Sequence, residues 1–264
     1  MIAGIEVVHV AVVTAAAPDD ELANKVAAAI GKSPYETRLR LTGKVPKIIA
    51  NFDTQQKAEL AARSLRDLGL VTVVISDPEL RKPPQIFKVR SLKLEEQRVT
   101  FIDRAGQSKR VEFNQLFLIL SARLQAYTEI ETTRTKRKIN VMATLVTGIP
   151  VPKKVEEKVT SKTFETESFL RLYDRISPDS AIEISQHGLD YSFLGEEMTS
   201  AAGANYGLAI KRLRAAFPQA IFDDSLIDPF GSKAPATMAR DAIEANCKLI
   251  YWCHRAVTGT GTAL

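Results

Sequence analysis

Cysteine is scarce in this chain, and that scarcity excludes a fold held together by disulfides. The 264 residues contain two cysteines, Cys247 and Cys253, both near the C-terminal end. Small secreted domains that lack a sufficient core depend on several disulfides. We therefore expect both thiols to be reduced and the protein to be cytoplasmic.

Long apolar runs are also missing. A helix that spans a bilayer needs about 20 consecutive apolar residues, and no stretch of the sequence approaches that length. The first residues, MIAGIEVVHVAVVT, alternate in polarity and include a histidine and a glutamate. This pattern predicts a strand and not a signal peptide, so we expect no membrane span.

Glycine is absent where a nucleotide-binding loop would need it. Residues 47–76 predict a strand, a helix and a strand, the order in which many nucleotide-binding units begin. The first junction reads Phe52-Asp53-Thr54-Gln55 and has no glycine. Backbone amides approach phosphate closely where glycines permit it, and Asp53 would repel the anion. We interpret this segment as scaffold and expect no cofactor.

The remaining composition is that of a globular protein with an uneven charge. Hydrophobic residues make up 45% of the chain and charged residues 25%, and the length favours two domains. Residues 86–160 contain 15 basic and 8 acidic side chains, whereas residues 161–264 contain 10 and 13. A basic middle segment could meet nucleic acid or an acidic partner. A solvated face is the simpler interpretation.

The first 77 residues predict the element order β-α-α-β-α-β. Strand patterns lie at 5–14, 47–52 and 71–76. Acidic residues 19–21 open the first helix and Gly31 ends it. The capping box Ser33-Pro34-Tyr35-Glu36 starts a second helix that runs to about Thr42.

The third predicted helix begins at a cap formed by Asp53 or Thr54 and ends at Gly69. Its spacing predicts a Glu59–Arg63 pair on the solvent side. The residues expected on its buried side are Ala58, Ala61, Leu65 and Leu68.

A family resemblance follows from the order and lengths of these elements. The segments that carry it are Ala29-Ile30-Gly31, Ser33–Thr42, Val45-Pro46, Lys57-Ala58-Glu59 and Leu68-Gly69 followed by residues 71–74. They resemble the C-terminal domain of the bacterial ribosomal stalk protein and the Clp-protease adaptor that shares its fold. The resemblance implies a small protein-docking module without chemistry of its own. The adaptor's Asn-Asp pair is replaced here by Thr14-Ala15-Ala16, and only Gly31 and Lys32 correspond to the stalk domain's binding surface.

A proline-rich segment at 78–85 predicts a semi-rigid linker between two domains. The pattern then changes to period two, and a hairpin turn is expected at 104–107. The predicted strands are 86–94, 98–104, 109–113, 118–131, 169–173 and 181–186, the predicted helices are 203–217 and 236–257, and 258–264 is a frayed tail. Together they predict an α+β protein whose domain 86–257 is a curved sheet or partial barrel closed by helices.

The densest basic stretch is TTRTKRK, residues 132–138. Its cations could bind phosphate or an acidic protein surface, although no aromatic residue is interleaved for stacking on bases. The alternative, which we favour, is a solvated loop that leaves a long strand. The candidate binding residues are Arg134, Lys136, Arg137 and Lys138.

Three further clusters are weighed against structural roles. Cys247, Cys253 and His254 could suggest a metal, but residues 243, 247, 250 and 254 form a packing stripe, so no metal site is expected. Asp223, Asp224 and Asp228 could bind a hard cation, but no calcium-loop pattern surrounds them, and turn or capping roles are favoured.

A possible nucleophile cluster lies in SQHGLDYS, where His187 and Asp190 stand near Ser185 and Ser192. The strained Gly-x-Ser-x-Gly turn is absent, so we favour a hairpin turn. His9 is interpreted as a partly covered sheet histidine.

We therefore predict no catalytic residues and hypothesise a non-enzymatic, adaptor-like binding or scaffolding protein that binds a protein partner or itself. The alternative is a nucleic-acid-binding protein that uses the basic 86–160 segment, and a hydrolase-like enzyme ranks third.

Overall fold

The computed structural model describes residues 7–13, 19–42, 45–139, 152–227 and 240–259, and the side chains within these ranges except 125–139, 152–165, 240 and 241. The chain forms two compact units. The first contains residues 1–124 and 167–264, and the second contains residues 125–166. The α+β class is confirmed.

The N-terminal elements are β1 (Val8–Val13), α1 (Asp20–Ile30), α2 (Pro34–Leu41), β2 (Lys47–Phe52), α3 (Gln55–Asp67), β3 (Val71–Ser76) and α4 (Asp77–Arg81). The chain continues through β4 (Gln85–Lys88), β5 (Ser91–Leu94), β6 (Arg98–Ile102), β7 (Ser108–Glu112), β8 (Leu116–Ile139) and β9 (Pro152–Asp174). The last elements are β10 (Ser180–Ser185), η1 (Tyr191–Glu197), α6 (Ala202–Ala216), β11 (Ile221–Leu226) and α7 (Arg240–Val257).

The predicted β-α-α-β-α-β order is confirmed, and its strands form an antiparallel sheet in the order β2-β1-β3. The predicted helix caps are also present. Asp19 accepts the amide of Leu22 at 2.7 Å, and Ser33 accepts that of Glu36 at 3.2 Å. Thr54 caps α3, while Asp53 pairs with Lys57.

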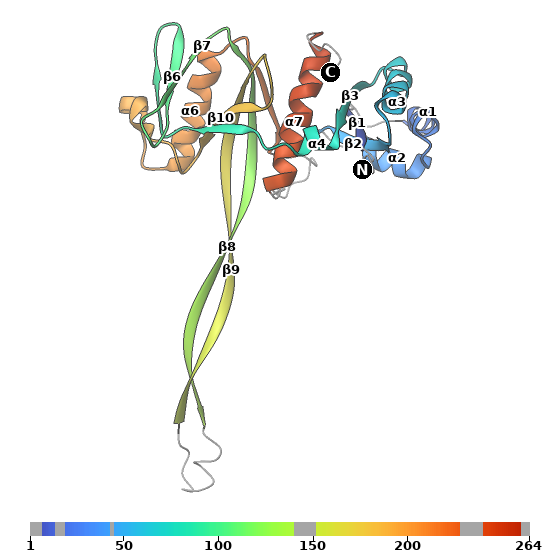
Figure 1. Ribbon diagram of the computed structural model, residues 1–264. Helices are drawn as coiled ribbons and strands as arrows, with labels where there is room; N and C mark the ends of the chain where they lie inside the picture. The colour runs from blue at the N-terminus through green and yellow to red at the C-terminus, as the bar shows by residue number, and fades with distance from the viewer. Residues whose placement is uncertain (1–6, 14–18, 43–44, 140–151, 228–239, 260–264) are drawn as a thin grey trace, which may run out of the picture. The chain divides into compact units, whose positions relative to one another are not determined.

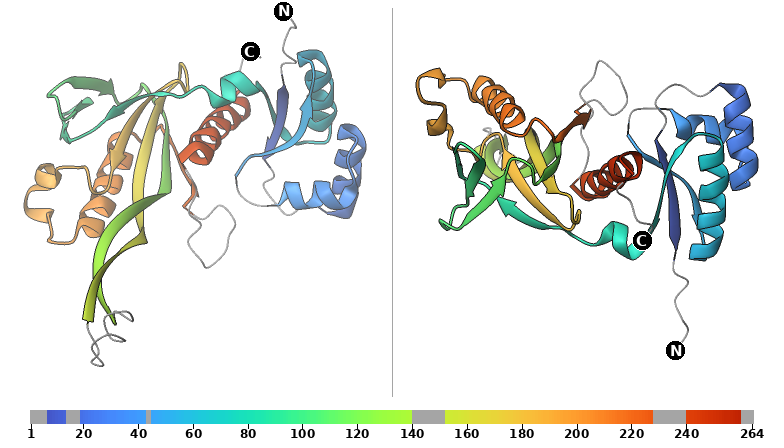
Figure 2. Two further views of the ribbon diagram at one scale, coloured as in Figure 1. Left: turned by 60° about the horizontal axis from the view of Figure 1, so that its bottom comes forward. Right: turned by 90° about the horizontal axis from the view of Figure 1, so that it is seen from above.

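Both faces of this sheet are buried, by different parts of the chain. One face packs on the helices through a core that includes Val10, Val26 and Leu65. On the other face Val73 and Ile75 pack with Leu249 and Cys253 of α7. Figure 2 shows the α7 helix beside this sheet. The predicted Glu59–Arg63 pair is wrong, because Glu59 lies 3.7 Å from Arg66, one turn further along α3.

The predicted linker begins as a helix. Ser76 caps α4, and Leu80 is buried against α7. Lys248 of α7 is 1% exposed, and its Nζ donates to the Glu79 carbonyl at 2.7 Å and to Asp179 Oδ1 at 3.2 Å. The first half of the segment is therefore fixed to α7.

In the first unit, the chain after α4 is built around a five-stranded sheet. Its strand order is β11-β8-β9-β10-β4. One face packs on α6 and on the separate β5-β6-β7 sheet through residues such as Ile119, Leu170 and Leu213. The other face packs on α7 through residues such as Leu120 and Tyr251. Residues 116–122 of β8 thus contribute to both cores. The sheets are not closed into a barrel, so of the two predicted alternatives, a curved sheet or a partial barrel, the structure favours the open sheet.

Two strand predictions need correction. The expected strand at 86–94 is divided into β4 and β5, because the chain turns at Val89 and Arg90, whose amides bond to different sheets. Strand β11 was not predicted at all. It reads Ile221-Phe222-Asp223-Asp224-Ser225-Leu226, and its two aspartates hide the strand pattern.

The second unit consists of the outer parts of β8 and β9, neighbouring strands that form a twisted two-stranded ribbon (Figure 1). The predicted strand ending at Glu131 continues to Ile139. The segment 132–138 is therefore strand and not a loop.

Candidate functional site

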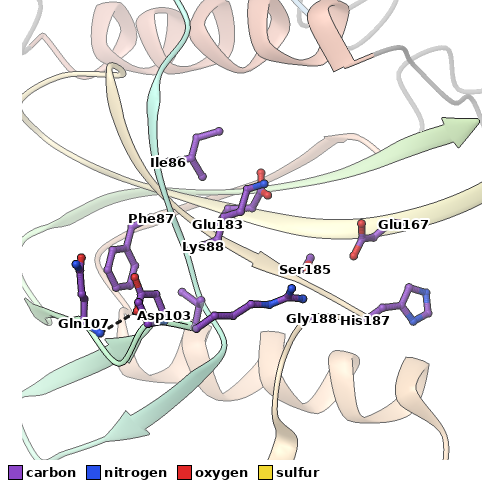
Figure 3. Close-up of a pocket in the computed structure, with 13 residues that line it drawn as sticks. Ile86, Phe87, Lys88, Asp103, Gln107, Glu167, Glu183, Ser185, His187 and Gly188 are labelled. Carbon is purple, nitrogen blue, oxygen red and sulfur yellow. Dashed lines mark hydrogen bonds between the residues drawn. The ribbon is translucent and has the colours of Figure 1, made fainter.

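A groove of about 710 Å³ lies in the first unit where β4 passes between the β6–β7 turn and β10. Figure 3 shows Asp103 and Gln107 on one side of β4 and Glu167, Ser185 and His187 on the other. The lining residues are Ile86, Phe87, Lys88, Val89, Asp103, Arg104, Ala105, Gln107, Glu167, Glu183, Ser185, His187 and Gly188.

Strand β4 lies at the edge of the central sheet and pairs with β10 in parallel. The amides of Gln85 and Val89 donate to β10-side carbonyls at 2.7 and 2.9 Å. Because alternate residues of a strand direct their backbone groups to opposite sides, the amides of Ile86 and Lys88 point away from β10. Within the described part of the chain no strand pairs with that edge. Ile86 and Lys88 also line the groove, so an added strand could reach this edge there.

The wall formed by the β6–β7 turn is held by Asp103. Its Oδ1 accepts the amides of Ala105 at 2.9 Å and Gln107 at 2.8 Å. Gly106 has a φ of 80°, a conformation that side chains of L-residues rarely adopt. The predicted turn at 104–107 is confirmed, and the Asp103 carboxylate is engaged in holding it.

The opposite wall follows β10. The amide of Gly188 donates to the Ser185 carbonyl at 3.2 Å, so a turn is present here. It is not the predicted hairpin turn, because η1 follows it and not a strand. A Cβ at position 188 would lie 2.5 Å from Ser185 Oγ, so a larger residue there would require that hydroxyl to move. Arg90 donates to the Gly188 carbonyl at 2.9 Å and ties this wall to the chain after β4.

The nucleophile hypothesis receives no support from the geometry. Asp190 accepts the Ser192 amide at 3.0 Å at the start of η1, and this hydrogen bond holds the pKa of Asp190 below its usual range. His187 is exposed and forms no hydrogen bond or ion pair with another described residue. Ser185, His187 and Asp190 are thus neighbours without a proton relay.

Beneath the groove lies a buried ionic cluster that the sequence reasoning missed. Arg171, 0% exposed, donates through Nε to Glu183 at 2.7 Å and through Nη1 and Nη2 to Glu244 at 2.9 and 2.7 Å. Burial opposes the Arg171 charge, but Glu244 and the neighbouring acidic groups outweigh burial and raise its pKa. The available signal was a charged residue inside the apolar run Phe169-Leu170-Arg171-Leu172-Tyr173.

Several charged side chains that line the groove are available to bind a ligand, because no other described residue pairs with them. Glu183 is engaged by Arg171, whereas Lys88, Arg104 and Glu167 form no ion pair with another described residue. The groove therefore presents charges of both signs beside an unpaired strand edge. Such a surface can hold a polar, extended chain.

The remaining sequence candidates lie apart from this groove. Arg134, Lys136, Arg137 and Lys138 stand on β8 in the second unit, and their side chains lie outside the described ones. Whether they bind an anion stays a prediction.

The cysteine and histidine cluster separates into two environments. Cys247 lies in the core between α7 and the central sheet, while Cys253 lies in the core with Val73 and Ile75. His254 Nε2 lies 2.6 Å from Asp223 Oδ2, and Ser225 donates to Asp223 Oδ1. Asp223 thus has a local structural partner, Asp224 is exposed on β11, and Asp228 lies outside the described residues.

His9 is more deeply buried than the sequence indicated. It is 8% exposed, and its two ring nitrogens lie 2.8 Å from Asn51 Oδ1 and 3.0 Å from Asp77 Oδ1. It joins β1 to β2 and to the start of α4. We assign it a structural role.

Two kinds of feature are absent from the described residues. Histidine, cysteine, aspartate and glutamate side chains nowhere gather there in threes as a metal site would require. Among the helices of the same described part, none has the length and apolarity to cross a bilayer.

Comparison with known proteins found no relative. No protein-family model, curated protein or solved structure matches the chain.

Proposed function

We propose that this protein is a non-enzymatic binding protein that recognises a protein partner as an extended segment added to the free edge of β4. The observation that carries the proposal is the unpaired edge of β4 inside a groove of about 710 Å³. Strand addition derives affinity from main-chain hydrogen bonds and specificity from side chains along the groove.

The groove chemistry defines the segment that fits. Lys88 and Arg104 favour a carboxylate in the bound segment, and Glu167 favours a cation. Phe87 and Ile86 are partly buried and offer apolar contact. The expected ligand is a short extended peptide with charges of both signs. The adaptor-like role and a cytoplasmic location are part of this proposal, as is the resemblance of residues 1–77 to a docking module.

The test begins with a displayed library of random peptides selected on the intact protein. Hydrogen exchange is then measured with and without a selected peptide. We expect added protection at the amides of Ile86 and Lys88, because these face the free edge. Selection of no peptide, or protection confined to other segments, would contradict the proposal.

A matched pair of variants isolates the backbone contribution. Ile86→Pro removes a donor that faces away from β10, so the ladder with β10 is kept, and peptide affinity should fall by at least about tenfold. Ile86→Val keeps the donor and should bind as the parent protein does. Equal affinity of all three proteins would show that the edge is not used.

A further inference from the structure

The second unit leaves both of its strand edges open. Strand β11 pairs with β8 only between Leu118 and Ala122, and β10 pairs with β9 only between Phe169 and Leu172. All of these positions belong to the first unit. Within the described part of the second unit, residues 125–139 and 152–166 therefore have only each other as neighbours, as the ribbon in Figure 1 shows.

Such a ribbon is incomplete as a folding unit. A two-stranded sheet is marginally stable in water, and three or more strands are needed for independent stability. Its unpaired amides and carbonyls are a template for a further strand. An added strand would supply hydrogen-bond partners for these amides and carbonyls.

The sequence of β9 fits a second copy of itself. In an antiparallel pair related by a two-fold axis, the central residue faces its own copy and the flanking residues exchange partners symmetrically. A register centred on Val159 uses the whole of residues 152–166. It places Lys153 opposite Glu165 and Glu156 opposite Lys162, each pair occurring twice by symmetry.

The other positions of this register are compatible with pairing. Val159 faces Val159, a β-branched pair of the kind that stabilises strands. Lys158 faces Thr160 and Glu157 faces Ser161, so no like charges stand directly opposite. On β8 the basic residues cluster at 134–138, and a register centred on Thr133 gives only Glu129 opposite Arg137. The charge pattern thus favours β9.

We propose that a second copy of this chain pairs antiparallel along the free edge of β9, with Val159 at the two-fold axis. Two ribbons then form one four-stranded sheet, and the charges of β9 are neutralised across the interface. This self-association is independent of peptide binding at β4.

Cysteine cross-linking tests the register. Directly opposite residues have Cβ atoms about 4.5–5.5 Å apart, close to the range that a disulfide spans. Val159→Cys should form a disulfide-linked dimer under mild oxidation. The native thiols, Cys247 and Cys253, are buried and do not compete.

The matched control is Thr163→Cys. In the proposed register its copy lies eight positions away, about 26 Å along the strand, so it should cross-link much more slowly. A Val159→Cys protein that stays monomeric, or a Thr163→Cys protein that cross-links equally fast, would overturn the register.

Charge exchange tests the interface itself, with sedimentation equilibrium as the measurement. Glu156→Lys places like charges opposite each other twice and should weaken the dimer by about tenfold or more. Adding Lys162→Glu restores opposite charges and should return the affinity to within about twofold of the parent protein. A monomeric parent protein, or a double variant as weak as the single one, would refute the proposal.

Discussion

At the scale of single residues, the buried charge of Arg171 is the feature that most needs compensating partners. Its guanidinium is fully covered and contacts two carboxylates from different elements, Glu183 on β10 and Glu244 on α7. Removing one partner of a buried ionic cluster leaves uncompensated charge. The cluster therefore links α7 to the central sheet, in addition to the apolar contacts between them.

Arg171→Met should destabilise the protein by roughly 3–5 kcal/mol, because Glu183 and Glu244 would lose their counter-charge in a covered site. Denaturant unfolding measures the change. The control is Arg98→Met, which breaks the exposed pair with Glu95 and should leave the unfolding curve unchanged. Similar curves for both variants would mean that the buried cluster is solvated.

The two thiols should be inert in the folded protein. Burial raises the pKa of Cys247 to about 12 and, together with the charge of Asp223, that of Cys253 to about 12. The thiolate is the reactive form, so neither cysteine should react with a thiol reagent at pH 8 until the protein unfolds, when both should react. Prompt labelling of the native protein would contradict this expectation.

Asp223 should contribute stability that depends on pH. Burial alone would raise its pKa, but hydrogen bonds from His254 and Ser225 outweigh burial and lower it. A lowered pKa stabilises the fold above the ordinary carboxyl value of about 3.9, and this contribution is lost as pH falls through the folded-state pKa. The stability difference between the parent protein and Asp223→Asn should therefore shrink below about pH 4. A difference that stays constant to pH 2 would exclude this linkage.

At the scale of elements, capping residues and glycines in the sequence were sufficient to locate the ends of helices. The caps Asp19, Ser33 and Thr54 and the glycines Gly31 and Gly69 bounded the first three helices correctly because each acts within one turn of chain. The sequence did not indicate strand β11, because its partner β8 is distant in sequence. In addition, Asp223 accepts a local hydrogen bond from Ser225, as a turn residue would. The sequence did not indicate the β4 groove for the same reason, since its lining comes from four separated segments, residues 86–89, 103–107, 167 and 183–188.

The buried side of α3 gives a direct test of the N-terminal core. Leu65 is 0% exposed and packs with Val10 and Ile49. Leu65→Ala should cost roughly 2–5 kcal/mol through the cavity that it leaves. Leu60→Ala on the exposed side of the same helix is the control and should be nearly neutral. Equal effects of the two changes would show that the helix face is misassigned.

The basic run of β8 remains a prediction that can be tested without knowing its partner. Changing Arg134, Lys136, Arg137 and Lys138 together to alanine should reduce retention of the protein on a polyanion column and make retention less dependent on salt. Thermal stability should be nearly unchanged if these charges are exposed. Unchanged retention would remove nucleic acid and other polyanions as ligands of this segment.

At the scale of the whole molecule, α7 is the element that sequence reasoning placed least well. Its stripe Ile243, Cys247 and Ile250 packs on the central sheet as expected. The helix is also buried on a second side, where Leu249 and Cys253 cover the N-terminal sheet. A 3.6-residue pattern reveals one apolar face clearly, but a helix between two sheets has two. By contacts, residues 1–77 consequently do not separate from the rest of the first unit.

Two neighbouring substitutions on α7 decide whether the predicted boundary at 78–85 divides two independent domains. Ile250 faces the central sheet and Leu249 faces the N-terminal sheet, and they are 2% and 3% exposed. If α7 joins both sheets into one cooperative structure, Ile250→Ala and Leu249→Ala should each shift a single unfolding transition by roughly 2–5 kcal/mol. Fluorescence and circular dichroism should then report the same midpoint for each variant. Independent domains would instead give two transitions, with Leu249→Ala lowering only the one that belongs to residues 1–77, and that fragment would fold alone. Coincident transitions in both variants would show that the N-terminal module depends on a helix encoded more than 160 residues later.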